Sequence, residues 1–139
     1  MFFSEDFNQY GTENLSDYLG INITQVSNTE VHSELAVQEH HMASNGFLHT
    51  GSIVTLADTS CSHGCIANLP NKAIGFKTIE VKSSQLDTTR DGYLNCIASV
   101  VYLGQNKQVW EAIITHRESG KTIALFQCTL MILYEQHSS

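Results

Sequence analysis

The chain has 139 residues and a formal net charge of −7, with 42% apolar residues and only 15% charged residues. This length predicts one domain with a hydrophobic core of its own. Proteins that bind nucleic acids present a basic surface to the phosphates, and the acidic balance excludes that class. All seven Lys and Arg residues lie between Lys72 and Lys121. Positive charge for an anionic ligand must therefore come from the second half of the chain or from helix N-termini.

The opening residues 1–10 contain no basic segment and no long apolar run, so we expect no signal peptide. No apolar run approaches the roughly 20 residues that a membrane-spanning helix needs. We therefore expect a cytoplasmic protein without a membrane segment, whose four cysteines are free thiols. These are Cys61, Cys65, Cys96 and Cys128.

The first predicted element is a short helix at about 5–19. Leu15, Tyr18 and Leu19 give it an apolar edge, and Gly20 suits the position just after a helix end. Beyond it we expect the core of the domain, from about residue 20 to residue 133.

Two short strands, at 21–26 and 30–38, and an irregular segment at 39–48 lead to a long helix at about 50–67. One stripe of this helix is apolar and rich in small residues, which permits close packing; it comprises Ile53, Leu56, Ala57, Ser60, Cys61 and Gly64. Asp58 falls at the edge of the stripe. A charged side chain at such a position requires a partner or a function.

The remainder of the chain predicts strands at 73–86, 92–103, 108–116 and 122–133. Residues alternate between apolar and polar in several of these segments. Short connections that contain glycine favour an antiparallel meander. The order of elements indicates a single α+β domain over residues 1–139, with the long helix packed on one face of the sheet.

Residues 45–59 read NGFLHTGSIVTLADT and lie where the irregular segment enters the long helix. The first N–H groups of a helix carry partial positive charge and can stabilise an anion or a developing oxyanion. Thr50 and Gly51 are placed to offer such groups, and Asp58 follows two turns later.

This segment resembles the hotdog-fold thioesterases, in particular their phenylacetate-degradation branch. The family pattern is roughly Asn-x-x-Gly-x-x-His-Gly-Gly followed by Leu-x-Asp or Leu-x-Glu. The resemblance covers about residues 20–133 and is carried by Gly46, His49, Gly51, the run from Leu56 to Thr59, the run from Thr78 to Val81, and the run from Thr122 to Phe126.

The resemblance implies an antiparallel sheet wrapped around a long central helix, in a homodimer whose active site lies between subunits, and a tetramer made of two dimers. The implied reaction is hydrolysis of an acyl-CoA thioester to a free acid and CoA. Asp58 takes the position of the catalytic carboxylate, as general base or as nucleophile. The N–H of Thr50 polarises the carbonyl, and His49 and Thr78 take supporting positions. No metal and no cofactor are implied, apart from CoA as part of the substrate.

The candidate substrate-binding residues are Asn45, Gly46, Ser62, Thr78, Lys82 and Arg90. Lys77 and Arg117 are further candidates for the CoA phosphates, because basic residues are few. His40 and His41 are expected in an exposed loop at the edge of the pocket.

Two positions depart from the family pattern. Thr50 replaces a glycine, and the upstream Asn or Gln that positions the carboxylate or water falls on Ala43, with Asn45 or Gln38 as replacements through a shifted loop. Ala43 favours an alternative function, a non-catalytic acyl-CoA-binding or regulatory domain. A hotdog dehydratase or hydratase is a third reading, for which the chain shows no matching His and acid arrangement.

Purely structural readings also exist. Asp58 suits a buried acid that Thr or Ser hydroxyls satisfy, His49 a cap, and Thr78 an ordinary strand residue. Cys61, His63 and Cys65 have the residue types of metal ligands. On a helix, however, His63 points away from the other two, and zinc requires four convergent ligands.

Overall fold

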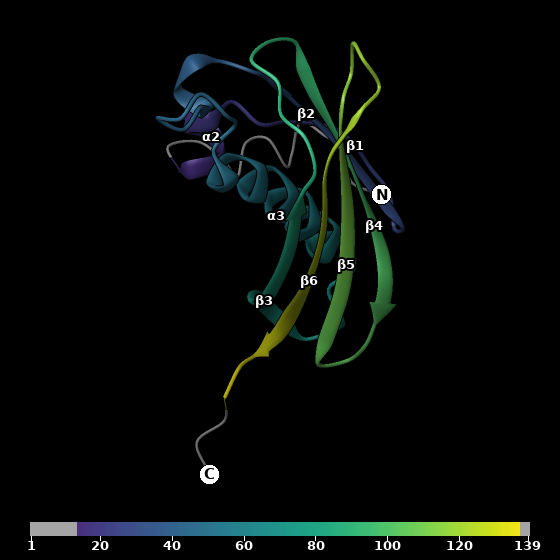
Figure 1. Ribbon diagram of the computed structural model, residues 1–139. Coiled ribbons are helices and arrows are strands. Elements are labelled where there is room, and N and C mark those ends of the chain that lie inside the picture. Colours follow the sequence, from purple (N-terminus) through teal and green to yellow (C-terminus); the bar gives the residue numbers. More distant parts are fainter. Residues whose placement is uncertain (1–13, 137–139) are drawn as a thin grey trace.

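The computed structural model describes residues 14–136 and has the predicted α+β architecture. Its elements, in chain order, are α2 (Leu15–Leu19), β1 (Asn22–Val26), β2 (Glu30–Ala36), the 3-10 helix η1 (Glu39–His41), α3 (Thr50–Ala67), β3 (Ala73–Gln85), β4 (Tyr93–Leu103), β5 (Lys107–His116) and β6 (Thr122–Tyr134). The predicted strands and the long helix thus agree with the structure to within a few residues. The sheet curves past the long helix α3, as expected for a hotdog fold (Figure 1).

The sheet has six antiparallel strands in the order β1-β2-β4-β5-β6-β3. Strands β4, β5 and β6 form the predicted meander. The prediction was wrong for β3, which pairs with β6 rather than with β4, the strand that follows it. The connection at 86–92 therefore crosses the end of the sheet, and this crossing brings the end of β3 near the start of α3 (Figure 1).

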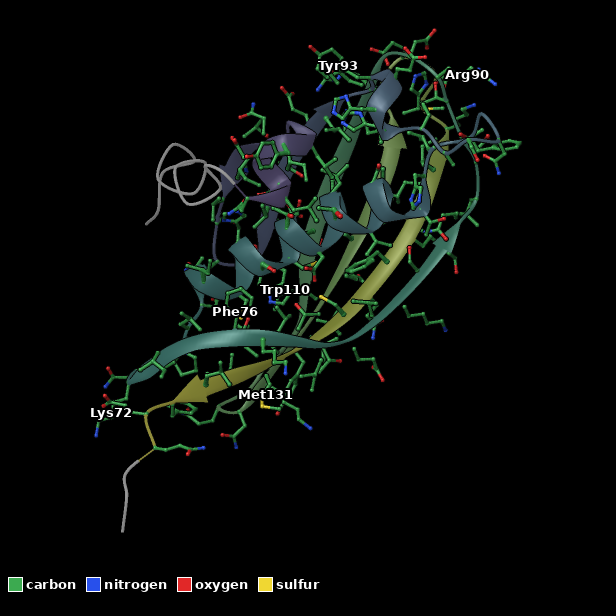
Figure 2. The ribbon with its side chains drawn as sticks, turned by 90° about the vertical axis from the view of Figure 1, so that its left-hand side faces the viewer. Lys72, Phe76, Arg90, Tyr93, Trp110 and Met131 are labelled. Carbon is green, nitrogen blue, oxygen red and sulfur yellow. The ribbon has the colours of Figure 1, made fainter. Side chains whose placement is uncertain are left out.

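Helix α3 packs against the sheet through the predicted stripe, whose members are all buried. Trp110, which is fully buried, lies between helix and sheet (Figure 2). A Cβ atom added to Gly64 would come within 2.5 Å of the Trp110 ring. The small-residue stripe thus provides the room in which this large side chain packs.

The N-terminal helix is described only from Leu15 to Leu19, and its predicted part at 5–13 lies outside the described residues. The Asn14 side chain accepts a hydrogen bond from the N–H of Asp17 and caps the helix start. Gly20 ends the helix with φ of 82°, in the left-handed region, as its position predicted.

The outer face of the sheet, opposite α3, carries an exposed apolar row. Pairing places Ile97 beside Ile113, and Ile113 beside Leu125. These side chains are 43%, 49% and 46% exposed, respectively. All four cysteines, in contrast, are buried free thiols. No helix within residues 14–136 is long and apolar enough to cross a membrane.

Candidate active site

The first turn of α3 is capped by His49. Its Nδ1 atom accepts a hydrogen bond of 2.8 Å from the N–H of Gly51. In the neutral ring the proton therefore resides on Nε2, which is left as a donor. A Cβ atom added to Gly51 would lie 3.0 Å from Nδ1, so a glycine at this position lets the imidazole approach the backbone N–H closely. The expectation that Gly51 offers a free N–H was wrong, because His49 occupies it.

Thr50 is the first residue of α3, and its N–H has no acceptor among residues 14–136. Thr50 is also exposed, so this N–H is accessible to a ligand. Together with Nε2 of His49, it gives the helix start two available hydrogen-bond donors. Two donors in the positive field of a helix N-terminus are suited to the oxygen of a polarised carbonyl.

A pocket of about 520 Å³ opens beside this helix start. Its walls come from three places: the segment before α3, the start of α3, and the end of β3 with the connection that follows. The lining residues are Ala43, Asn45, Phe47, Leu48, His49, Thr50, Ile53, Gln85, Leu86, Asp87 and Thr88. A hydrogen bond of 2.9 Å from the N–H of Leu48 to the Thr88 hydroxyl joins the segment before α3 to the connection after β3.

Gly46 and Arg90 meet beside this pocket, since Gly46 lies between the lining residues Asn45 and Phe47. Gly46 has φ of +86°, and a Cβ atom added to it would lie 2.3 Å from Nη2 of Arg90. The guanidinium of Arg90 therefore lies directly against the backbone of Gly46. Figure 2 shows Arg90 at the end of the molecule where α3 begins and Lys72 at the opposite end. Arg90 has no acidic partner within residues 14–136, so its charge is available to a ligand.

Asp58 lies two turns further along α3 and is half-buried. The Thr78 hydroxyl, on β3, donates a hydrogen bond of 3.1 Å to Oδ1 of Asp58. Burial raises the pKa of this carboxyl above its ordinary value, and the bond from Thr78 opposes part of that rise. Thr78 is thus more than an ordinary strand residue. Ser62 follows one turn after Asp58 and is partly exposed.

The predicted cations separate into different environments. Lys82 lies on the outer face of the sheet, in a second pocket with Glu111 and Gln127, away from α3. Arg117 is held by Glu34 at 2.7 Å and stacks on the Tyr93 ring. Of the cations predicted to bind substrate, the structure brings Arg90 against Gly46, between the lining residues Asn45 and Phe47, and leaves Lys82 apart from the pocket.

The two adjacent histidines do not line the pocket. His41 is fully buried rather than exposed, and its Nε2 donates a hydrogen bond of 2.7 Å to the carbonyl of Leu19. The carbonyl of His41 in turn accepts from the N–H of His49 and the hydroxyl of Ser52. His41 therefore holds the start of α3 in place through buried hydrogen bonds, and its role is structural.

The residues proposed to replace the missing amide at Ala43 are also engaged. Gln38 forms a capping box with His41 at the start of η1. Asn45 lines the pocket, but its Oδ1 accepts a hydrogen bond of 3.1 Å from the N–H of Phe47. Sequence analysis missed a third amide, Gln85, which lines the same pocket from β3. Only the pairing of β3 with β6 brings it there, so no local sequence signal marked it.

Among residues 14–136 no group of three or more His, Cys, Asp or Glu side chains is arranged to hold a metal ion. Cys61 and Cys65 instead pack in the core. A hydrogen bond with Cys128 and burial raise the pKa of the Cys61 thiol, and burial raises the pKa of the Cys65 thiol.

The family follows from a match of residues 45–123 to the model of the thioesterase superfamily. The chain belongs to the thioesterase superfamily. The match includes the helix start, Asp58 and Thr78, and extends over more than half of the chain. It does not distinguish the phenylacetate-degradation branch, which stays a prediction.

Two curated relatives carry the name of a CoA-thioester hydrolase. A 1,4-dihydroxy-2-naphthoyl-CoA hydrolase of Listeria monocytogenes is 29% identical over 118 residues, which cover 85% of this chain and 94% of the relative. An enzyme of the same name from Escherichia coli is 25% identical over 134 residues, covering 93% of each chain. The solved structure of a Haemophilus influenzae thioesterase matches with a TM-score of 0.89 and 26% identity, over 99% of this chain and 96% of that one.

Proposed function

We propose that this protein hydrolyses the thioester of an acyl-CoA to a free acid and CoA. The observation that carries the proposal is the pairing of two features on one helix. An open N–H and an imidazole donor stand at its start, and a half-buried carboxylate held by Thr78 stands two turns later. The family match and the names of the relatives, which are hydrolases of a CoA thioester, support the same reaction.

The two features must come from different subunits. Thr50 and Asp58 are eight residues apart, which is about 12 Å along a helix that rises about 1.5 Å per residue. One carbonyl group cannot be within hydrogen-bond reach of both. We therefore propose a homodimer in which Thr50 of one subunit works with Asp58 of the partner subunit.

Strand β3 is the surface that we propose for this dimer. It lies at the edge of the sheet, and four consecutive residues, Ile79 to Lys82, are exposed. Ile79 and Val81 are 41% and 49% exposed, and an exposed apolar edge strand favours pairing with another strand. Antiparallel pairing about Val81 would set Thr78 of the partner subunit opposite Ser84. The partner's Asp58 would then lie near the end of β3, beside the helix start.

In this arrangement the thioester oxygen accepts hydrogen bonds from the N–H of Thr50 and from Nε2 of His49. Asp58 of the partner subunit removes a proton from water as the water oxygen bonds to the carbonyl carbon. The carbon–sulfur bond then breaks, and the CoA thiolate leaves and takes up a proton. The raised pKa of Asp58 favours the role of base, because a stronger base accepts the proton more readily.

Arg90 is the cation that we propose for a phosphate of CoA. It lies against Gly46 beside the pocket, and an Arg side chain can present two parallel N–H donors to phosphate oxygens. Asn45, Gly46 and Ser62 remain proposed substrate contacts.

We further propose that two dimers associate into a tetramer through the exposed row of Ile97, Ile113 and Leu125, because contiguous apolar patches on a folded surface mark interaction sites. A cytoplasmic location agrees with the four free thiols.

The direct test is thiol release from short, medium, long and aromatic acyl-CoAs, with the oligomeric state measured by light scattering in the same buffer. Hydrolysis by a dimer or tetramer supports the proposal. Saturable acyl-CoA binding without any turnover would contradict it, and would favour the non-catalytic binding domain that the missing amide at Ala43 suggests.

A further inference from the structure

We infer that Gln85 positions the water that attacks the thioester, an inference that rests on the proposed function. Gln85 is the last residue of β3 and lines the pocket at the start of α3 together with His49 and Thr50. Its side chain belongs to the face of the sheet that α3 covers, because it pairs with Ala124, which is fully buried.

The amide of Gln85 is oriented by its own strand. Its Nε2 donates a hydrogen bond of 2.5 Å to the hydroxyl of Ser83, two residues earlier on the same face. Its Oε1 receives no hydrogen bond from residues 14–136. The carbonyl oxygen of this side chain is therefore available as an acceptor in the pocket.

Three other polar side chains of the pocket wall already accept hydrogen bonds from the protein. The hydroxyl of Thr88 accepts from the N–H of Leu48 at 2.9 Å. Oδ1 of Asp87 accepts from the N–H of Thr88 at 2.8 Å and forms an ion pair with Lys121 at 3.4 Å. Oδ1 of Asn45 accepts from a backbone N–H in its own turn. Oε1 of Gln85, in contrast, is an amide acceptor of this pocket to which no group of residues 14–136 donates.

An attacking water needs two acceptors, since it has two O–H bonds and must direct a lone pair at the carbonyl carbon. Asp58 of the partner subunit takes one proton during attack, and Oε1 of Gln85 accepts a hydrogen bond from the other O–H. Pairing of β3 strands about Val81 places the partner's Asp58 near the end of β3. Gln85 would then lie between that carboxylate and the donors at the helix start, where the water must be.

The test compares Gln85→Leu with the wild type on the best acyl-CoA substrate. We expect kcat to fall by about 10-fold, because one hydrogen bond of roughly 1.4 kcal/mol corresponds to a factor of 10. The Kd of a non-hydrolysable thioether analogue should stay unchanged. In Gln85→Glu the acceptor oxygen is retained, but its negative charge raises the pKa of the nearby Asp58 of the partner subunit. This variant should recover kcat at higher pH, with the acidic limb of its pH profile shifted upward.

Gln127→Leu is the matched control, because Gln127 is exposed on the outer face of the sheet, and its kcat should equal that of the wild type. A kcat of Gln85→Leu within twofold of the wild type would overturn the inference while leaving the proposed function in place. A loss of kcat accompanied by an equal loss of analogue binding would also overturn it. Absence of turnover in the wild type would instead contradict the proposed function itself.

Discussion

Replacing Asp58 with asparagine tests the chemistry and the structural reading of this residue at once. The amide has nearly the same shape and can still accept the hydrogen bond that Thr78 donates at 3.1 Å, so the contact between α3 and β3 persists. It cannot remove a proton from water. A general base contributes roughly 10²- to 10⁴-fold to a rate, so kcat should fall by about that factor.

Stability should move in the opposite direction. Burial raises the pKa of Asp58, which means that the fold disfavours its ionised form at neutral pH. A neutral amide removes that cost, so the midpoint of thermal unfolding should stay equal or increase. Loss of activity with equal or greater stability distinguishes a catalytic group from a structural acid.

The assay is thiol release at pH 7, combined with thermal unfolding of the same preparations. Glu111→Gln is a suitable control, since it removes one negative charge from the outer face of the sheet. Refutation would be an Asp58→Asn protein that keeps more than a tenth of the wild-type kcat. Isotopically labelled water in a single turnover separates the two routes, because direct attack by Asp58 places the label in the protein and base catalysis places it in the acid.

Three further predictions follow from particular contacts. Thr78→Val removes a bond that favours the ionised carboxylate of Asp58, so the acidic limb of the pH profile of kcat should move to higher pH; an unchanged limb would contradict the coupling. Burial lowers the pKa of His63 to about 4; because the unfolded chain binds this proton near pH 6.5, the free energy of unfolding should fall by roughly 3 kcal/mol as the pH drops from 7 to 4. Urea unfolding should show that His63→Phe loses most of this pH dependence. Gly64→Ala places a methyl group against the Trp110 ring and should destabilise the fold by about 1–3 kcal/mol, whereas Gly75→Ala, which adds a Cβ into open space, should show no such clash.

The structural features that depend on a local sequence pattern could be predicted. The apolar stripe of α3, the helix entry after His49 and the strand alternation each express the period of one element, so they could be read from neighbouring residues. Asp58 was singled out because an acid beside such a stripe is unusual. The resemblance gave Thr78 a supporting position, but its hydrogen bond to Asp58 was not predicted. Features of this kind can be predicted from residues that are close together in the sequence.

Other features depend on how distant segments meet. The placement of β3 beside β6 could not be read from a short connection, and it decides both that Gln85 reaches the pocket and that Lys82 faces away. The occupied N–H of Gly51 follows from the rotamer of the neighbouring histidine. Burial of His41 likewise depends on a carbonyl from α2, more than twenty residues earlier in the chain.

The cap formed by His49 also constrains how the protein manages protons. The lone pair of Nδ1 accepts the hydrogen bond from the N–H of Gly51, so a proton on that nitrogen would break the cap of the first turn of α3. While this bond holds, the ring faces the pocket as a donor through Nε2. In the proposed dimer, the cap at the start of α3 therefore leaves proton removal to Asp58 of the partner subunit.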